Sequence, residues 1–126
     1  MNVKPVAAKL GIKPAQSVFV INPPGNYETL VGGLPPGTTV VRHRPADVVH
    51  VFARTLVELA EHGAEATAAV KPGGLVWISY PKNGASELKR DMLRDAINGW
   101  QPVSQVAIDD TWSAMRFRPD AEVGTR

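Results

Sequence analysis

A chain of 126 residues can bury one hydrophobic core, but it is short for a two-domain enzyme that depends on a cofactor. Its 14 Lys and Arg residues exceed its 12 acids by too little to suggest a nucleic-acid-binding surface, and its lack of cysteine excludes disulfides and thiolate chemistry. No apolar run is long enough for a membrane span or a secretion signal. We therefore expect one cytoplasmic domain over residues 1–126, with an ordered core of about 5–118, that binds neither nucleic acid nor a membrane.

The first half of the chain alternates between apolar runs and turn signals. A short helix is predicted over residues 6–10, and the uniformly apolar run 17–21 predicts a central strand covered on both faces. Asn26 can cap a short helix, and a strand over residues 38–41 completes a β-α-β unit. Residues 42–47 then leave no room for a crossover helix. The sequence therefore leaves open whether residues 38–41 form a short parallel edge strand or run antiparallel.

The next apolar run, residues 47–53, predicts a second central strand that is interrupted only by His50. A histidine flanked by valines is typical of a hydrogen-bonded interior side chain. A helix follows, and its predicted buried face consists of Leu56, Leu59, Ala60 and Ala64. Gly63 is expected to weaken the middle of this helix.

The last third of the chain predicts a strand, a helix and a hairpin. Residues 71–74 end the preceding helix, and residues 75–80 form a buried strand. The helix after it is expected to be capped by Ser86 and to bury Leu88, Met92, Leu93, Ala96 and Ile97. Residues 103–108 and 111–118 predict an antiparallel hairpin. This alternation of strands and helices indicates an α/β sandwich.

Several motifs in the second half of the chain resemble known families. The sequence KPGG at residues 71–74, ahead of a buried strand, is similar to the turn before the fifth strand of class I methyltransferases that use S-adenosylmethionine (SAM). The motifs WISYPK at residues 77–82 and IDDTWSA at residues 108–114 resemble a family of small bacterial proteins, a domain of unknown function similar to a truncated methyltransferase. The likeness covers residues 10–118. It implies a small Rossmann-like, degenerate class I methyltransferase-like, three-layer sandwich with a C-terminal antiparallel hairpin, and no established activity.

A methyltransferase of this class would have an acid and a glycine-rich turn after its first strand, and a second acid for the ribose hydroxyls after its next strand. This chain has Asn22-Pro23-Pro24-Gly25 at the first place and Arg42-His43-Arg44 at the second. Each proline lacks an N–H, and a guanidinium cannot accept a hydrogen bond. We therefore expect no cofactor and a non-catalytic binding or regulatory module that has lost SAM binding. The alternative is a SAM-dependent methyltransferase with altered cofactor contacts.

Ligands of open α/β sheets bind beyond the carboxyl ends of the strands. The candidate ligand-binding residues expected at this edge are Asn22, Gly25, Tyr27, Arg42, Arg44, Lys82, Asp109 and Trp112. No residue is assigned a catalytic or metal-binding role. Because the edge is cationic and aromatic, a small anion or a protein is the expected partner, and an uncovered sheet edge leaves a homo-oligomer open.

Each of these side chains also has a purely structural interpretation. Lys82 either holds an anion or pairs with Asp109 or Asp110 and so tethers the hairpin. Trp112 either stacks on a planar ligand or closes the core beneath the hairpin tip. Tyr27 acts either as a lid or as a packing residue, and the arginines after residue 41 either grip a phosphate or belong to a solvated loop.

Overall fold

The computed structural model describes residues 6–42, 45–82, 88 and 90–120. Its strands are β1 (Ser17–Ile21), β2 (Thr39–Val41), β3 (Ala46–Phe52), β4 (Val70–Pro81), β5 (Trp100–Ala107) and β6 (Trp112–Pro119). Its helices are α1 (Val6–Lys9), α2 (Tyr27–Leu30), α3 (Leu56–Ala69) and the 3-10 helix η1 (Arg90–Asp95). None of the described helices is long and apolar enough to cross a lipid bilayer.

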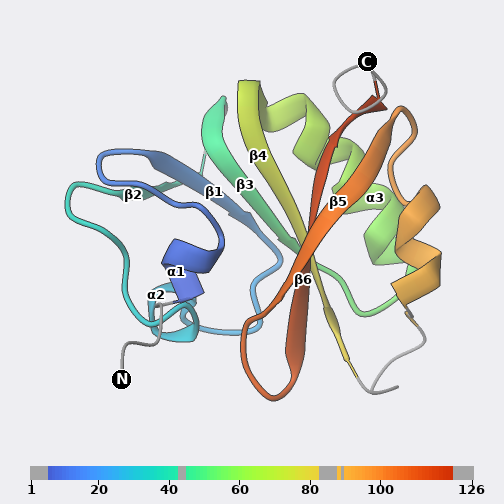
Figure 1. Cartoon of the computed structure of the whole chain (residues 1–126), viewed down its shortest axis with the longest axis horizontal. Coiled ribbons are helices and arrows are strands. Elements are labelled where there is room, and N and C mark those ends of the chain that lie inside the picture. The colour runs from blue at the N-terminus through green and yellow to red at the C-terminus, as the bar shows by residue number, and fades with distance from the viewer. Residues whose placement is uncertain (1–5, 43–44, 83–87, 89, 121–126) are drawn as a thin grey trace.

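The six strands form one sheet in the order β2-β1-β3-β4-β6-β5 (Figure 1). Strands β2, β1, β3 and β4 are parallel, whereas β6 is antiparallel to β4 and β5 is antiparallel to β6. The direction of the strand after residue 38 is thereby settled, because Thr39 pairs with Ser17 in parallel register at the edge of the sheet. Since β2 has only three residues, the path back to the start of β3 is short and needs no helix.

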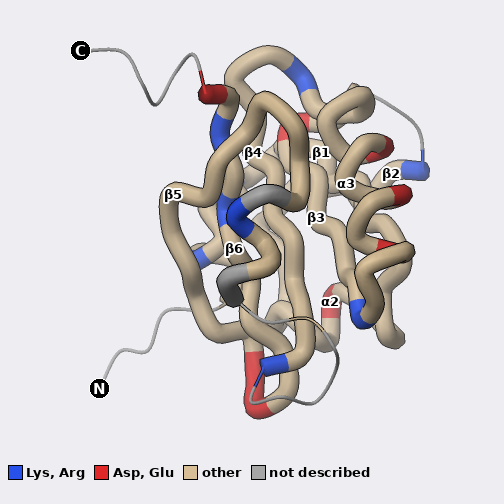
Figure 2. Tube along the Cα trace, turned by 90° about the vertical axis from the view of Figure 1, so that its right-hand side faces the viewer, with Lys and Arg blue, Asp and Glu red and all other residues tan. Residues whose placement is uncertain are grey.

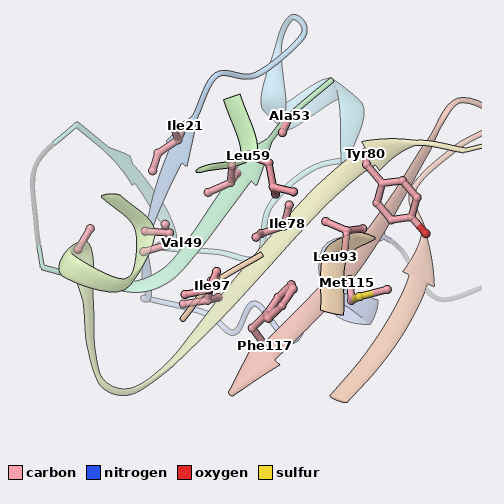
Figure 3. Close-up of a cluster of buried hydrophobic side chains, with 14 of the residues drawn as sticks. Ile21, Val49, Ala53, Leu59, Ile78, Tyr80, Leu93, Ile97, Met115 and Phe117 are labelled. Atoms are coloured by element: carbon pink, nitrogen blue, oxygen red, sulfur yellow. The ribbon is translucent and has the colours of Figure 1, made fainter. Parts of the chain in front are cut away.

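Helices cover both faces of the sheet, which gives the expected three layers. On one face, α3 and η1 enclose a core that includes Val49, Ile78 and Phe117 (Figure 3). On the other face, α1 and α2 pack over a second core that includes Val48 and Trp77. Successive strand residues point to opposite faces. The nearly continuous apolar runs in β1 and β3 therefore fill both cores.

The buried face of α3 shares only Leu59 with the predicted one. It consists of Leu59, Gly63, Ala66 and Ala69. Leu56 is 49% exposed, and Ala60 and Ala64 also face solvent. A Cβ atom at Gly63 would lie 3.3 Å from Ile97 Cγ1, so the missing side chain allows the helix to approach Ile97 closely. The glycine expected to weaken the helix therefore marks its packing face.

The KPGG segment lies within β4 and does not separate it from α3. Ala46 pairs with Val70 and Val48 pairs with Leu75, so residues 71–74 bulge out of register. The Asp47 carboxylate holds this region together: it accepts hydrogen bonds from Ser17 N at 2.8 Å and from Lys71 Nζ at 3.3 Å. These hydrogen bonds, chiefly the one from the Ser17 backbone, lower the pKa of Asp47. The motif therefore stabilises the amino end of the sheet, away from the ligand-binding edge.

The helix expected after Ser86 lies partly outside the described residues, because residues 83–87 and 89 are not among them. The described part contains η1, and Leu88, Leu93 and Ile97 are buried as predicted. Met92, expected in the same stripe, is 41% exposed. A 3-10 helix has about three residues per turn, which moves side chains away from the positions expected for an α-helix.

Candidate ligand-binding site

The order in which strands are added to the sheet reverses at β1: β2 lies on one side of β1, and β3 lies on its other side. The β1–β2 connection carries α2 on one face, whereas the β3–β4 connection carries α3 on the opposite face. In open α/β sheets such a switch point leaves a crevice outside the carboxyl ends of the two strands, where ligands bind. The carboxyl ends of β1 and β3 therefore mark the place to examine.

A hydrogen bond from Asn22 bridges this crevice. Its side-chain Nδ2 donates to the backbone oxygen of Phe52, at the end of β3, over 3.0 Å. Asn22 adopts a φ of 60°, a left-handed conformation that asparagine tolerates better than most residues do. Pro23 and Pro24 follow and present no N–H. This Asn22–Phe52 hydrogen bond, which we call the latch, therefore connects the loop after β1 to the end of β3.

Beside this latch lies a pocket of about 280 Å³. Its walls come from the loop after β1, from α2 and from the start of β6, and its lining residues are Pro24, Gly25, Asn26, Thr29, Leu30 and Trp112. Asn26 caps α2, as predicted, by accepting a hydrogen bond from Thr29 N at 2.9 Å. Two of the predicted ligand-binding residues, Gly25 and Trp112, thus line the pocket.

Trp112 closes the core and also lines the pocket. It is only 4% exposed, and its ring meets Phe52 edge-to-face with the ring centres 5.2 Å apart. The guanidinium carbon of Arg54 lies 4.8 Å from the centre of the indole, a cation–π distance. Trp112 therefore closes the core beneath the hairpin tip, and only a small part of it reaches the pocket.

Beneath the site runs a fully buried chain of polar groups. The Tyr27 hydroxyl and His50 Nδ1 share a hydrogen bond of 2.8 Å, and His50 Nε2 and Ser79 Oγ share one of 2.5 Å. The His50 ring stacks on Phe52 at 4.4 Å. Burial lowers the pKa of His50 to about 3 and raises the pKa of Tyr27. His50 is therefore a neutral interior histidine, as predicted, and Tyr27 is a packing residue.

The ion pair considered between Lys82 and Asp109 or Asp110 does not hold the hairpin tip. Other hydrogen bonds do so. Asp109 Oδ1 accepts hydrogen bonds from Thr111 N at 2.8 Å and Trp112 N at 2.7 Å, so this carboxylate shapes the turn. In the described part of the chain neither Asp109 nor Asp110 pairs with Lys82. The tether is instead a backbone bond of 2.8 Å from Lys82 N to Thr111 O. The proposed ion pair is therefore wrong, although the connection it was meant to explain exists.

The predicted cationic residues do not line the pocket. Arg42 is exposed just after β2, and Arg44 lies outside the described residues. Figure 2 shows Lys and Arg interspersed with Asp and Glu along the chain. The pocket residues missing from the prediction are Pro24, Asn26, Thr29 and Leu30. They lie within eight residues of Asn22, so the loop and the first turn after it were the available signal.

A larger cavity of about 390 Å³ lies at the opposite end of the sheet, between η1 and the start of β5. Its lining residues are Arg94, Ile97, Asn98, Gly99, Trp100, Gln101 and Asp120. It lies far from the switch point, so we assign it no role. No group of three or more His, Asp or Glu side chains comes together as a metal site within the described ranges.

Comparisons with known proteins connect this fold to methyltransferases. No protein-family model and no curated protein matches the chain. Among solved structures, TrmN from Thermus thermophilus matches 90% of this chain and 47% of its own, with a TM-score of 0.65 and 10% identity. This chain therefore spans about half the length of TrmN.

Two other solved structures give the same fold. The ribosomal protein L11 methylase from Lactobacillus delbrueckii subsp. bulgaricus matches with a TM-score of 0.55 and 10% identity over 89% of this chain and 73% of its own. DhpI in complex with SAH matches with a TM-score of 0.54 and 14% identity over 89% and 79%. The chain thus has the Rossmann-like fold of class I methyltransferases with a C-terminal antiparallel hairpin, which confirms the expected fold.

The residues at this edge do not fit SAM in the way that the resemblance implies. The side chain after β1 already donates to Phe52 O, and two prolines stand where backbone donors are needed. The position after β2 holds Arg42, which offers no acceptor for ribose hydroxyls. We therefore derive no methyl-transfer step through this site.

Proposed function

We propose that this chain is a ligand-binding module built on the methyltransferase fold, which takes a small molecule in the pocket between Pro24 and Trp112. It does not hold SAM as class I enzymes do. The observation that carries this proposal is the Asn22–Phe52 hydrogen bond of 3.0 Å, which crosses the switch-point crevice. The pocket beside it is open, whereas the crevice itself is bridged.

A second candidate function is SAM-dependent methyl transfer with altered cofactor contacts. The fold comparisons favour this candidate over the first, since one similar structure is a methylase and DhpI was solved with both SAH and SAM. It requires the Asn22 side chain to leave Phe52 O, or the cofactor to lie outside the latch. The two candidates therefore differ in whether the chain binds SAM at all, either in an opened crevice or outside the latch.

Calorimetric titration with SAH separates these candidates. We expect no saturable heat from the wild-type chain up to millimolar ligand, and no methyl transfer from labelled SAM to components of a cell extract. Saturable binding in the micromolar range overturns the first candidate in favour of the second. The variant Asn22→Gly removes the latch while accepting the positive φ. If this variant alone binds SAH, the latch is what closes the crevice.

A positive test examines the pocket itself. A fragment library is screened by ¹H–¹⁵N NMR, with the amides of Gly25, Asn26 and Thr29 as reporters. We expect at least one chemical class of fragment to move these resonances together. If no class does so, the chain is not a small-molecule-binding module at this edge.

A further inference from the structure

We infer that the pocket selects a planar, uncharged aromatic ring that carries an amide group, with the ring on the apolar surface of Pro24, Leu30 and the small exposed part of Trp112, and the amide toward Asn26 and Thr29. This inference deepens the proposed function and rests on it. It also departs from the small anion that the cationic edge suggested. Four features of the pocket lead to it: its charge, its apolar walls, its polar groups and its size.

The lining of the pocket supplies no charged partner for an ionic ligand, and the Arg54 guanidinium already lies over the Trp112 ring. Every one of its lining side chains is neutral: Pro24, Gly25, Asn26, Thr29, Leu30 and Trp112. Helix α2, with four residues, is too short to provide an N-terminal anion site. Burying an ionised group without an opposite charge costs far more than burying a neutral polar group with hydrogen bonds. Because Pro24, Gly25, Asn26 and Thr29 are exposed, an ionic ligand would keep part of its hydration but would gain no charged partner from the lining, which favours a neutral ligand over carboxylates, phosphates and zwitterionic SAM.

The walls of the pocket indicate a flat ring. Pro24, Leu30 and Trp112 supply its apolar surface. The Trp112 ring is held in place by Phe52 at 5.2 Å and by Arg54 at 4.8 Å, and because the residue is 4% exposed only a small part of it, in a fixed orientation, reaches the pocket. Aromatic rings gain from offset or edge contacts with such a wall. A flexible aliphatic ligand would lose more conformational freedom for the same contact.

The polar part of the pocket complements an amide. Asn26 Oδ1 is already engaged by Thr29 N, and its amide nitrogen takes part in none of the hydrogen bonds found among the described residues. The exposed hydroxyl of Thr29 both donates and accepts. A carboxamide or a ring lactam carries a donor and an acceptor close together, so it can bond to both side chains at once.

The volume of the pocket limits the ligand to about one ring system. Pockets for drug-sized molecules measure roughly 300–1,000 Å³. At about 280 Å³, this pocket falls just below that range. It suits a single substituted ring or a free nucleobase, and it is too small for a nucleoside that carries an amino-acid tail.

Nicotinamide and nicotinate test the inference, because they have the same ring, which carries an amide in nicotinamide and a carboxylate in nicotinate. Each is titrated into the full chain and followed by the NMR shifts of Gly25, Asn26 and Thr29 and of the Trp112 indole. We expect nicotinamide to move these signals saturably and nicotinate to bind at least about tenfold more weakly. Equal or tighter binding of nicotinate overturns the neutral ligand and points to Arg54 as an anion contact, while the pocket keeps its role.

A pair of leucine variants tests the location. A Cβ atom at Gly25 would meet nothing within 4 Å, so Gly25→Leu fills the pocket without a backbone clash. We expect it to weaken nicotinamide binding by about tenfold or more. The matched control, Ala60→Leu, adds the same side chain at an exposed position of α3 and should leave the affinity unchanged. Undiminished binding by Gly25→Leu overturns the location.

The outcome also separates this inference from the proposed function. If neither ring binds but another fragment class moves the Gly25, Asn26 and Thr29 amides, the ligand class is wrong and the binding module stands. If no fragment moves them, both fail. Micromolar SAH binding that moves the same amides overturns both in favour of the second candidate function.

Discussion

The buried ring of His50 makes the stability of this protein depend on pH. Its two nitrogens are occupied by Tyr27 and Ser79, and burial lowers its pKa to about 3, against 6.5 for an exposed histidine. Between these two pKa values the unfolded chain binds a proton that the folded chain does not. The free energy of unfolding is therefore at its full value above about pH 6.5 and falls as the pH drops below it.

We expect the free energy of unfolding to be about 2 kcal/mol lower at about pH 5 than at about pH 7.5, since each unit of pKa shift corresponds to about 1.4 kcal/mol. Urea denaturation at the two pH values measures the difference. In His50→Gln, whose amide does not titrate, the difference should largely disappear, whereas His62→Gln at an accessible position of α3 should retain it. Equal wild-type stability at both pH values would contradict a neutral buried His50.

At the level of elements, the loop between β1 and α2 depends on Asn22 in two ways, through its left-handed φ of 60° and through its bond to Phe52 O. Asn22→Gly removes the bond and accepts the left-handed φ without strain, and it should cost about 1 kcal/mol of unfolding free energy. Asn22→Ala removes the same bond and puts a residue that tolerates the left-handed region less well than asparagine at this φ, so it should cost about 1 kcal/mol more than Asn22→Gly. Denaturation of the two variants side by side measures both terms. An alanine variant as stable as the wild type would show that the loop is not latched.

The register shift between β3 and β4 depends on a glycine at its closest contact. A Cβ at Gly74 would lie 2.6 Å from the backbone oxygen of Asp47 and 2.7 Å from a methyl of Val70. Gly74→Ala should therefore lower the free energy of unfolding by about 1–3 kcal/mol. Gly25→Ala, where the added methyl meets open space, is the matched control and should change it by less than about 0.5 kcal/mol. Similar effects of the two substitutions would argue against the tight β3–β4 bulge.

Elements whose signals are local could be predicted from the sequence. The apolar run of β1, the Asn26 cap of α2 and the hairpin of β5 and β6 all lie where residue patterns placed them. The buried face of α3 could not, because Gly63 packs inward only on account of Ile97, which lies far along the chain. Periodicity favours the larger apolar side chains and overlooks a close approach between backbones.

The candidate site shows the same division. Asn22, Gly25 and Trp112 follow or begin strands, and the rule for strand ends was enough to select them. Arg54 meets Trp112 only because β3 ends and β6 begins at the same edge, with β4 between them. The role of Asp109 was missed because an Asp at a turn can bond to the backbone two residues ahead as readily as to a lysine.

On the scale of the whole molecule, the strands differ in how they are protected. β3 is paired on both sides, by β1 and β4, and both of its faces are covered. All of its residues except Asp47 are buried. β2 has three residues, a single neighbour and two exposed positions, and β5 forms the other edge. Stability against local opening should therefore be greatest at the middle of the sheet and least at β2.

Hydrogen exchange measured by mass spectrometry tests this gradient and the open question of a homo-oligomer. In dilute solution we expect peptides covering β3 to exchange at least about a hundredfold more slowly than those covering β2, because β3 opens only on global unfolding. A second copy that added a strand at either edge would slow exchange in β2 or β5 as the protein concentration rises. Protection of β2 that equals that of β3 even in dilute solution would contradict an unpaired outer strand. A rise in β5 protection with concentration would identify that edge as the contact between copies.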